Sequence, residues 1–334
     1  MKYVALLWPH ANVRYRSETL KLAQAELDIM LAQIAPEIQV SSTQILGMPV
    51  LELESEDPLS EDCLRALGDH SLLYGIFAWQ TDGALCPVQG RSIPYLGEDL
   101  PGILKYKGKT NEMFTQLLMN VALYAGDYWK EDRTIRLLDP MCGRGTTLFL
   151  GANRRWDCTG SDVDKNDLRE AEGFFKRYLE YHRLKHSITR SSLTVQGAKP
   201  SPCVRFVFSD TAEHYKSKET AELRMACTDA AKVTETFGRG AFHLIVCDLP
   251  YGVQHGAHGA TLDRLLEKLL PNWKDALKPG GTVGVAFNAQ TLPRKRVLEL
   301  MAQAGLQPMQ GEAYEQFEHW VEQAVTRDIA IGRK

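Results

Sequence analysis

Four aspartates follow short apolar runs of the chain, at Asp139, Asp162, Asp229 and Asp248. Each apolar run has the length and composition of a buried strand, so each acid is expected at a strand end. Carboxylates attract cations and accept hydrogen bonds from hydroxyl and amino groups. The pattern therefore predicts a site for a ligand that carries positive charge together with hydroxyl and amino groups.

A glycine-bearing turn follows the first of these acids. After Asp139 the chain runs through Pro140, Met141, Cys142, Gly143, Arg144 and Gly145, and Thr146 and Thr147 then open an apolar, helix-like stretch. A strand, a glycine turn and a helix are the elements with which an open α/β sheet binds a nucleotide-like ligand. Gly143 and Gly145 allow the backbone to approach that ligand without a Cβ in the way.

The residues of this turn discriminate between ligands. A phosphate-binding loop requires a lysine before the Ser/Thr, and Gly145 is followed directly by Thr146. A dinucleotide fingerprint requires a third glycine where Leu148 stands. Asp139 would repel a pyrophosphate and suits S-adenosylmethionine (SAM), which carries a sulfonium and an ammonium. An ordinary strand-to-helix turn is the alternative that this stretch alone leaves open.

The spacing of the later acids supports a nucleoside ligand. Asp162, followed by Val163, comes about 20 residues after the first glycine, where an acid binds ribose hydroxyls. Asp229 follows the run ELRMAC and is placed to accept a hydrogen bond from an adenine amino group. Asp248 ends HLIVCD and leads into Leu249, Pro250 and Tyr251.

With these residues in place, the chain resembles the class I SAM-dependent methyltransferases that modify exocyclic amino groups, whose fourth strand ends in Asp/Asn-x-Pro-Tyr/Phe. DLPYG after DPMCGRGTT is most similar to the guanine-N2 RNA methyltransferases of the THUMP-associated group. The resemblance covers residues 105 to the C-terminus. It implies an α/β, Rossmann-like, doubly wound and mostly parallel sheet, SAM as cofactor, and an RNA substrate with tRNA favoured over rRNA.

The segment 248–251 can then be assigned a chemistry. An exocyclic amino nitrogen is a poor nucleophile because its lone pair is delocalised into the base. The Asp248 carboxylate and the Leu249 carbonyl would accept from the amino hydrogens, while Pro250 stiffens the turn. Tyr251 would stack on the base, a contact worth roughly 1–3 kcal/mol. A base inside a duplex could not reach this pocket, so a flipped or loop base is expected.

Other interpretations of DLPYG remain open. Proline and glycine are favoured in turns, so Pro-Tyr-Gly could form a simple turn at the strand end. Adenine-N6 and protein-glutamine methyltransferases favour two prolines after the acid, a pattern from which Leu249 departs. A SAM- or RNA-binding subunit without catalysis is the alternative of another class, although the acids at 139, 162 and 248 are intact.

Composition indicates a globular protein of ordinary make-up. The 334 residues are 44% hydrophobic and carry a net charge of −3. Residues 1–110 hold nine Lys/Arg and 14 Asp/Glu, which argues against RNA binding there by charge alone. No apolar run reaches membrane-spanning length and the start is not typical of a signal peptide, so the cytoplasm is the expected compartment. The sequence sets no oligomeric state.

The seven cysteines do not indicate a metal site or a disulfide framework. Their number is odd and no Cys-x-x-Cys occurs, so we expect no metal and seven buried, unreactive thiols. Cys142 lies in the glycine turn, and Cys247 should point away from Asp248 across the strand.

Hydrophobic periodicity predicts a small ferredoxin-like α+β domain over 1–86, a linker over 87–104 and the methyltransferase domain over 105–334. No THUMP sequence is evident in the first domain. Ser17 and Thr110 are predicted helix N-caps, and a long helix is predicted from Asp164 to His186. Residues 187–221 are expected to form an insertion with one extra strand, and an antiparallel final hairpin is what the resemblance adds.

Four smaller features allow two interpretations each. The loop KYKGKT (105–110) is either solvated or in contact with phosphate. Phe114 and Thr115 either flank the cofactor or pack in the core. The basic, aromatic stretch 176–190 is either a solvated helix end or an RNA contact. His255 and His258 either contact substrate or are simply exposed.

Overall fold

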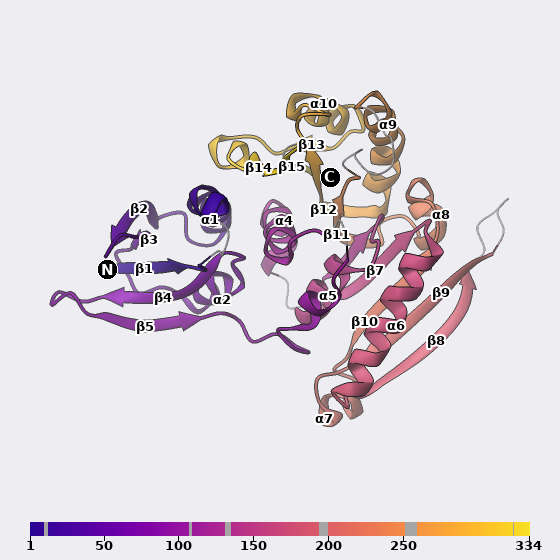
Figure 1. The fold of residues 1–334 in the computed structure, drawn as a ribbon, viewed down its shortest axis with the longest axis horizontal. Helices are drawn as coiled ribbons and strands as arrows, with labels where there is room; N and C mark the ends of the chain where they lie inside the picture. Colours follow the sequence, from indigo (N-terminus) through magenta and orange to yellow (C-terminus); the bar gives the residue numbers. More distant parts are fainter. Residues whose placement is uncertain (10–12, 107–108, 131–134, 194–199, 251–258, 323) are drawn as a thin grey trace.

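A computed structural model of the chain describes residues 1–9, 13–106, 109–130, 135–193, 200–250, 259–322 and 324–334. These residues form two β-sheets, a small one at the N-terminal end and a large one that carries the rest of the chain (Figure 1). Helices α1 (Val13–Ile34) and α4 (Glu112–Tyr124) lie side by side between the two sheets. No helix among the described residues is long and apolar enough to cross a membrane.

The small sheet has the strand order β2-β3-β1-β4-β5, with every neighbouring pair antiparallel. The element order is β1, α1, β2, β3, α2, β4, the ferredoxin-like succession that the sequence predicts, with β5 added at the edge. The strands are β1 (Lys2–Leu7), β2 (Gln39–Ile45), β3 (Met48–Glu54), β4 (Leu73–Trp79) and β5 (Leu85–Gly90), and the second helix is α2 (Glu61–Asp69).

One prediction for this part of the chain is wrong in detail. Ser17 lies inside α1, which begins at Val13, so it is not the N-cap. The predicted linker 87–104 contains the end of β5, which extends to Gly90, and a short helix α3, which covers Leu100–Ile103. The domain boundaries themselves stay a prediction.

The large sheet has the order β13-β15-β12-β11-β6-β7-β10-β9-β8, with β14 paired to β15. Its centre, from β12 to β10, is parallel, and the strands outside it are antiparallel. The strands are β6 (Arg136–Asp139), β7 (Asp157–Asp162), β8 (His186–Leu193), β9 (Ser201–Phe208), β10 (Ala221–Cys227), β11 (Phe242–Asp248), β12 (Leu277–Asn288), β13 (Gln307–Pro308), β14 (His319–Glu322) and β15 (Val325–Arg333).

Helices cover both faces of this sheet, as a doubly wound fold requires. One face packs on α4, α5 (Thr146–Asn153) and α6 (Lys165–Tyr181), and the other on α8 (Val233–Phe237), α9 (Gly259–Ala276) and α10 (Arg294–Gln303). Alternate strand residues enter the two cores: Leu137, Leu244 and Val246 enter one, and Leu138, Ile245 and Cys247 the other. The mostly parallel, doubly wound sheet and its antiparallel final hairpin are confirmed. The remaining helical pieces are α7 (Ala212–Lys216), η1 (Tyr128–Lys130), η2 (Ala230–Lys232) and η3 (Glu312–Glu315).

The insertion differs from the prediction. Helix α6 ends at Tyr181, five residues before the predicted end at His186, and His186 begins β8. The insertion therefore holds two strands, because β8 and β9 form an antiparallel hairpin that extends the sheet beyond β10.

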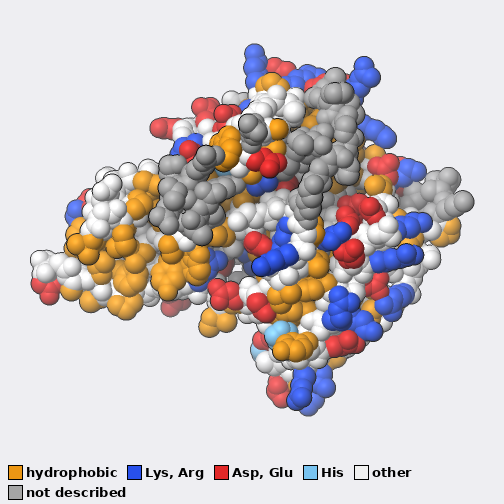
Figure 2. All heavy atoms as spheres, in the orientation of Figure 1, with side chains coloured by type: hydrophobic (Ala, Val, Ile, Leu, Met, Phe, Trp, Pro, Cys, Tyr) orange, Lys and Arg blue, Asp and Glu red, His pale blue; other side chains and the backbone are white. Residues whose placement is uncertain are grey.

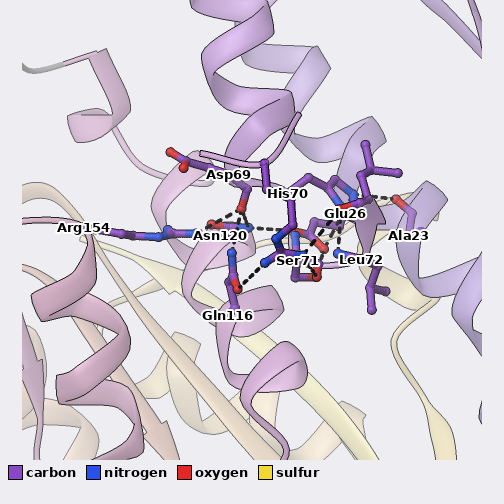
Figure 3. A network of polar contacts seen from close by, with 11 residues as sticks. Ala23, Glu26, Asp69, His70, Ser71, Leu72, Gln116, Asn120 and Arg154 are labelled. Carbon is purple, nitrogen blue, oxygen red and sulfur yellow. Dashed lines mark hydrogen bonds and ion pairs between the residues drawn. The ribbon is translucent and has the colours of Figure 1, made fainter. Parts of the chain in front are cut away.

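A buried polar network joins the N-terminal unit (residues 1–90, the small sheet with α1 and α2) to α4 (Figure 3). The Glu26 carboxylate on α1 accepts from the Ser71 amide at 2.9 Å, from the Ser71 hydroxyl and from Asn120 Nδ2 of α4 at 2.5 Å. His70 Nε2 lies 3.0 Å from the Ala23 carbonyl, and burial lowers the pKa of His70. Because buried polar groups must be satisfied, these bonds fix α1 against α4.

Candidate functional site

Three carboxylates meet at the carboxyl edge of the parallel strands. Asp248 ends β11, Asp139 ends β6 and Asp162 ends β7, and these strands are neighbours in the order β11-β6-β7. Burial is the main cause that raises the pKa of Asp139, and the charges of Asp162 and Asp248 raise it further. The structure thus brings together three of the four aspartates predicted from the sequence, at the edge where open α/β sheets bind ligands.

The glycine turn lies directly above this edge. Gly143 and Gly145 have φ of +48° and +89°, the left-handed region that glycine adopts at little cost. A Cβ on Gly143 would meet nothing within 4 Å, so the turn presents an open backbone surface there. The Cys142 amide donates to the Ser161 carbonyl at 2.9 Å, which fastens the turn to the end of β7.

Asp139 is almost fully buried beneath the turn. Its Oδ1 accepts from the Met141 amide at 3.1 Å, and Thr147, itself buried, also donates to the carboxylate. Burial nevertheless raises the pKa of Asp139 to about 7. A buried carboxylate of this kind is stabilised by a cationic ligand, because a nearby positive charge offsets the loss of hydration. Pro140 lies between Asp139 and Met141, and its carbonyl accepts from the Ser161 hydroxyl at 3.1 Å.

Asp162 is held by backbone donors. Its Oδ2 accepts from the Gly143 amide at 2.8 Å and its Oδ1 from the Asp164 amide at 2.9 Å. Val163, next to it, is 71% exposed, which leaves an apolar face beside the carboxylate.

Asp229 lies on the neighbouring strand end. The Thr228 amide donates to the Asp162 carbonyl at 3.1 Å, so the segments after β7 and β10 run together. The exposed Asp229 carboxylate accepts from the Ala231 amide at 2.8 Å and caps η2. Asp162, Val163 and Asp229 thus occupy adjacent positions along one edge.

The segment after β11 is anchored on its core side. The Leu249 amide donates to the Ala286 carbonyl at 2.9 Å, and the Leu249 side chain is buried. Asp248 is half-buried, and Pro250 follows at the limit of the described residues. Tyr251, His255 and His258 lie outside the described residues.

Two site residues were missed by reasoning from the sequence. The Thr110 hydroxyl donates to Asp248 Oδ2, and Asn111, not Thr110, caps α4 by accepting from the Met113 and Phe114 amides. The predicted Thr110 cap is therefore wrong. Asparagine is at least as favoured at the N-cap as threonine, so the residue type at position 111 was the signal that could have identified the true cap.

Tyr106 is the second missed residue. The Arg144 guanidinium lies 4.8 Å from the centre of its ring, and its hydroxyl lies 3.4 Å from the buried Thr146 hydroxyl. The loop before α4 thus covers the glycine turn. In the same loop, Lys109 pairs with Glu112 at 2.5 Å and donates to the Pro101 carbonyl at 2.6 Å. Lys109 is therefore neither a solvated side chain nor one directed at phosphate.

Other candidate residues have structural roles. Phe114 is buried and packs on His319 and Arg327, and Thr115 is also buried, which favours the core interpretation for both. At the end of α6, Lys176 pairs with Glu180 and Tyr181 is 83% exposed. Helix α6 ends at Tyr181 and residues 186–190 belong to β8, so the stretch 176–190 is a helix end only in part, and an RNA contact there stays a prediction.

The cysteines are all free, and the expectation that all seven are buried is wrong for two of them. Cys86 is exposed and Cys227 is half-buried, while the other five are buried. Burial raises the pKa of the Cys142 and Cys247 thiols well above the usual value, so neither is a nucleophile at neutral pH. Within the described ranges, no group of three or more His, Cys, Asp or Glu side chains could hold a metal ion.

These residues fit SAM. The buried Asp139 matches a cation, the backbone-held Asp162 matches ribose hydroxyls, and the open face of Gly143 admits close approach. Exposed Val163 and Asp229 match the apolar face and the amino group of adenine. Each predicted cofactor contact that the structure describes thus lies on one contiguous edge of the large sheet. We call this edge, which carries Asp139, Asp162 and Asp229, the cofactor edge.

Comparison with known proteins agrees with this fit. A family model described as "RMKL-like, methyltransferase domain" matches residues 120–310, more than half of the chain. Among curated proteins, none matches the sequence.

Solved structures with a similar fold include a TehB-like SAM-dependent methyltransferase from Corynebacterium glutamicum, with 18% identity, coverage of 61% of this chain and 82% of that one, and a TM-score of 0.35. Another is the rRNA methyltransferase aviRa from Streptomyces viridochromogenes, with 15% identity, 69% and 88% coverage, and a TM-score of 0.39.

Proposed function

The chain belongs to the family of RMKL-like methyltransferase domains and uses SAM as its cofactor, and from this premise we propose that it methylates the exocyclic N2 amino group of a guanosine in RNA, with tRNA as the favoured substrate. The observation that carries the proposal is the position of Asp248-Leu249-Pro250 at the end of β11, beside the strand that carries Asp139 and the glycine turn. The resemblance of DLPYG to the guanine-N2 group supports the choice of base.

Asp248 and Leu249 would hold the amino group. The carboxylate and the Leu249 carbonyl accept from its two hydrogens, which directs the nitrogen lone pair toward the cofactor edge. The hydrogen bond from the Leu249 amide to the Ala286 carbonyl and the buried Leu249 side chain fix the orientation of the Asp248-Leu249 backbone before substrate binds. Such preorganisation is the main contribution a protein makes to a transfer reaction that needs alignment.

SAM supplies the methyl group, the carbon–sulfur bond breaks and a carbon–nitrogen bond forms. The methylated nitrogen is then acidic and releases one proton, for which Asp248 is the nearest described base in the segment. Asp139 holds the cationic part of the cofactor and takes no part in the proton transfer.

The decisive experiment compares nucleosides. Nucleosides from the tRNA of a deletion strain, analysed by mass spectrometry beside those of the parent, should contain less N2-methylguanosine, and the amount should return when the gene is restored. If every N2-methylguanosine persists in both tRNA and rRNA, guanine-N2 is the wrong acceptor.

Other amino acceptors keep the same geometry, namely adenine-N6 and a protein glutamine. Purified protein incubated with labelled SAM and, separately, with RNA, DNA and a protein extract distinguishes them by which fraction gains label. The absence of label in all three would favour a non-catalytic partner subunit.

A further inference from the structure

A cleft of about 930 Å³ lies between the N-terminal unit and the large sheet. Its walls come from α2, the segment 91–101, α4 and the end of α5. Ile135 lines it, whereas Asp139 at the other end of β6 belongs to the cofactor edge, so the cleft and the candidate site lie at opposite ends of that strand. Figure 2 shows Lys and Arg side chains beside the hollow between the two units.

The cleft is locally basic in a chain that is acidic overall. Four arginines line it: Arg65, Arg91, Arg154 and Arg155. The acids in its lining are Asp69 and Glu98. Two of the four arginines come from residues 1–110, which are net acidic, so the positive charge here is concentrated against the trend of the segment.

Arg91 and Arg154 have only neutral partners among the described residues. Arg91 donates to the Ser71 and Leu73 carbonyls at 3.5 and 3.4 Å, and Arg154 Nη2 donates to the Asp69 carbonyl at 3.1 Å. Backbone carbonyls hold a guanidinium in place without cancelling its charge. Both side chains are half-buried, and oriented arginines of this kind suit phosphate oxygens, which accept paired N–H donors.

Aromatic rings accompany these arginines. The Arg154 guanidinium lies 5.0 Å from the centre of the Trp156 ring, and that of Arg155 lies 5.7 Å from the centre of the Tyr95 ring. Arg155 is also 3.6 Å from Glu219, a loose ion pair at an exposed position. Arginines beside aromatic faces are the combination with which proteins bind single-stranded nucleic acid.

We propose that this cleft binds phosphates of the RNA substrate several nucleotides away from the base that is methylated; the proposal rests on the RNA substrate inferred above. Ile135 and Asp139 are four residues apart in an extended strand, or about 13 Å, roughly the length of four stacked nucleotides. The carbonyl of Pro101, in the cleft wall, accepts a hydrogen bond from Lys109. The next residue, Thr110, donates a hydrogen bond to Asp248, so the wall is continuous with the candidate site.

The cleft requires the N-terminal unit to be docked. The Asp69 carbonyl, at the end of α2, accepts from Gln116, Asn120 and Arg154, as Figure 3 shows. These donors belong to α4 and to the end of α5, so this carbonyl joins the N-terminal unit to two elements of the opposite cleft wall. The N-terminal unit therefore binds RNA through the cleft that it forms, in spite of its net negative charge.

The test is the salt dependence of RNA binding. Bulk tRNA is titrated with the wild type and with an Arg91→Gln/Arg154→Gln double variant at several salt concentrations. The double variant should bind at least tenfold more weakly, with a salt slope smaller by about two, since each lost phosphate contact removes about one unit. SAM binding, measured by calorimetry, should be unchanged.

The matched control is Arg177→Gln/Arg183→Gln, which removes two exposed arginines at the end of α6. It should retain the wild-type slope. Equal slopes for the wild type and the cleft variant, or a loss in the control pair instead, would overturn the proposal. A wild type that neither binds nor methylates RNA would overturn the proposed function itself.

A measurement on the wild type covers the case in which the double variant does not fold. Ultraviolet cross-linking of bound tRNA, followed by peptide mass analysis, should place adducts in peptides that contain residues 91–95 or Trp129, which line the cleft. Adducts confined to other surfaces would contradict the proposal.

Discussion

The Thr110 hydroxyl donates a hydrogen bond to the Asp248 carboxylate, joining the start of α4 to the end of β11. Thr110 is part of the loop that also lays Tyr106 over the glycine turn. A carboxylate held by an O–H donor loses less conformational freedom when it binds an amino group. Thr110 is therefore a positioning residue for the reaction proposed at Asp248.

Replacement of Thr110 by Val should lower kcat for methyl transfer by about 10–100-fold, because hydrogen bonds to charged groups contribute about 1.5–3 kcal/mol. The shape of the side chain is preserved, so KM for RNA should change little. Thr110→Ser, which keeps the hydroxyl, should restore most of the rate. Steady-state kinetics of all three proteins decide the point; an increased rate in Thr110→Val would mean that the contact restrains Asp248 instead of positioning it.

Removal of the Asp248 carboxylate should abolish methyl transfer and leave SAM binding intact. Asp248→Ala removes both acceptor oxygens from the position that faces the substrate amino group. Asp229→Ala is the contrasting variant: its contact is proposed with adenine, so KM for SAM should rise while kcat at saturating SAM is retained. A near-normal kcat in Asp248→Ala would remove Asp248 from the mechanism.

Asp139 should couple both stability and cofactor binding to pH. Its folded-state pKa of about 7 lies above the ordinary value of 3.8. Between these values the folded protein holds a proton that the unfolded chain releases, so the free energy of unfolding without ligand falls as pH rises toward 7. A cationic ligand favours the ionised form, so the affinity for SAM should rise over the same interval.

The variant that tests this coupling is Asp139→Asn, which cannot ionise. Without ligand at pH 8 its Tm should exceed that of the wild type by a few degrees, while SAM binds at least tenfold more weakly and without this pH dependence. Asp157→Asn is the matched control. Burial raises the pKa of Asp157 as well. Asp157 lies at the end of β7 opposite to Asp162, however, and accepts a hydrogen bond from the Glu222 amide. Its SAM affinity should therefore stay at the wild-type level.

The cofactor edge could be predicted from the sequence because it follows one rule. Acids placed after successive parallel strands must meet at the same edge, and Asp139, Asp162 and Asp248 do so. The contact of Thr110 with Asp248 could not be predicted, since it joins residues 138 positions apart and leaves no periodic signal. Local capping rules assign Thr110 to the N-cap of α4, although asparagine, the residue at 111, is the more favoured N-cap type.

The junction between the two sheets was also beyond sequence reasoning. Hydrophobic periodicity places Ala23, Leu27 and Met30 on one apolar face of α1, and a glutamate at position 26 is not expected beside them. Glu26 is nevertheless fully buried, because Ser71 and Asn120 supply its donors from segments far along the chain. Buried polar groups with distant partners do not contribute to hydrophobic periodicity, so periodicity does not find them.

The Glu26 network should hold the N-terminal unit to α4. Glu26→Ala leaves the Ser71 and Asn120 donors buried without an acceptor, and each such loss costs about 1–3 kcal/mol. The free energy of unfolding should therefore fall by about 3 kcal/mol or more, whereas Glu37→Ala, at an exposed position beyond the end of α1, should have almost no effect. Glu26→Gln, which keeps one acceptor oxygen, should lie between them. Hydrogen exchange of the Glu26→Ala variant shows which helices the network holds. If the network joins α1 to α4, the amides of both helices should exchange faster. Faster exchange in α1 alone would show that α4 is held by other contacts.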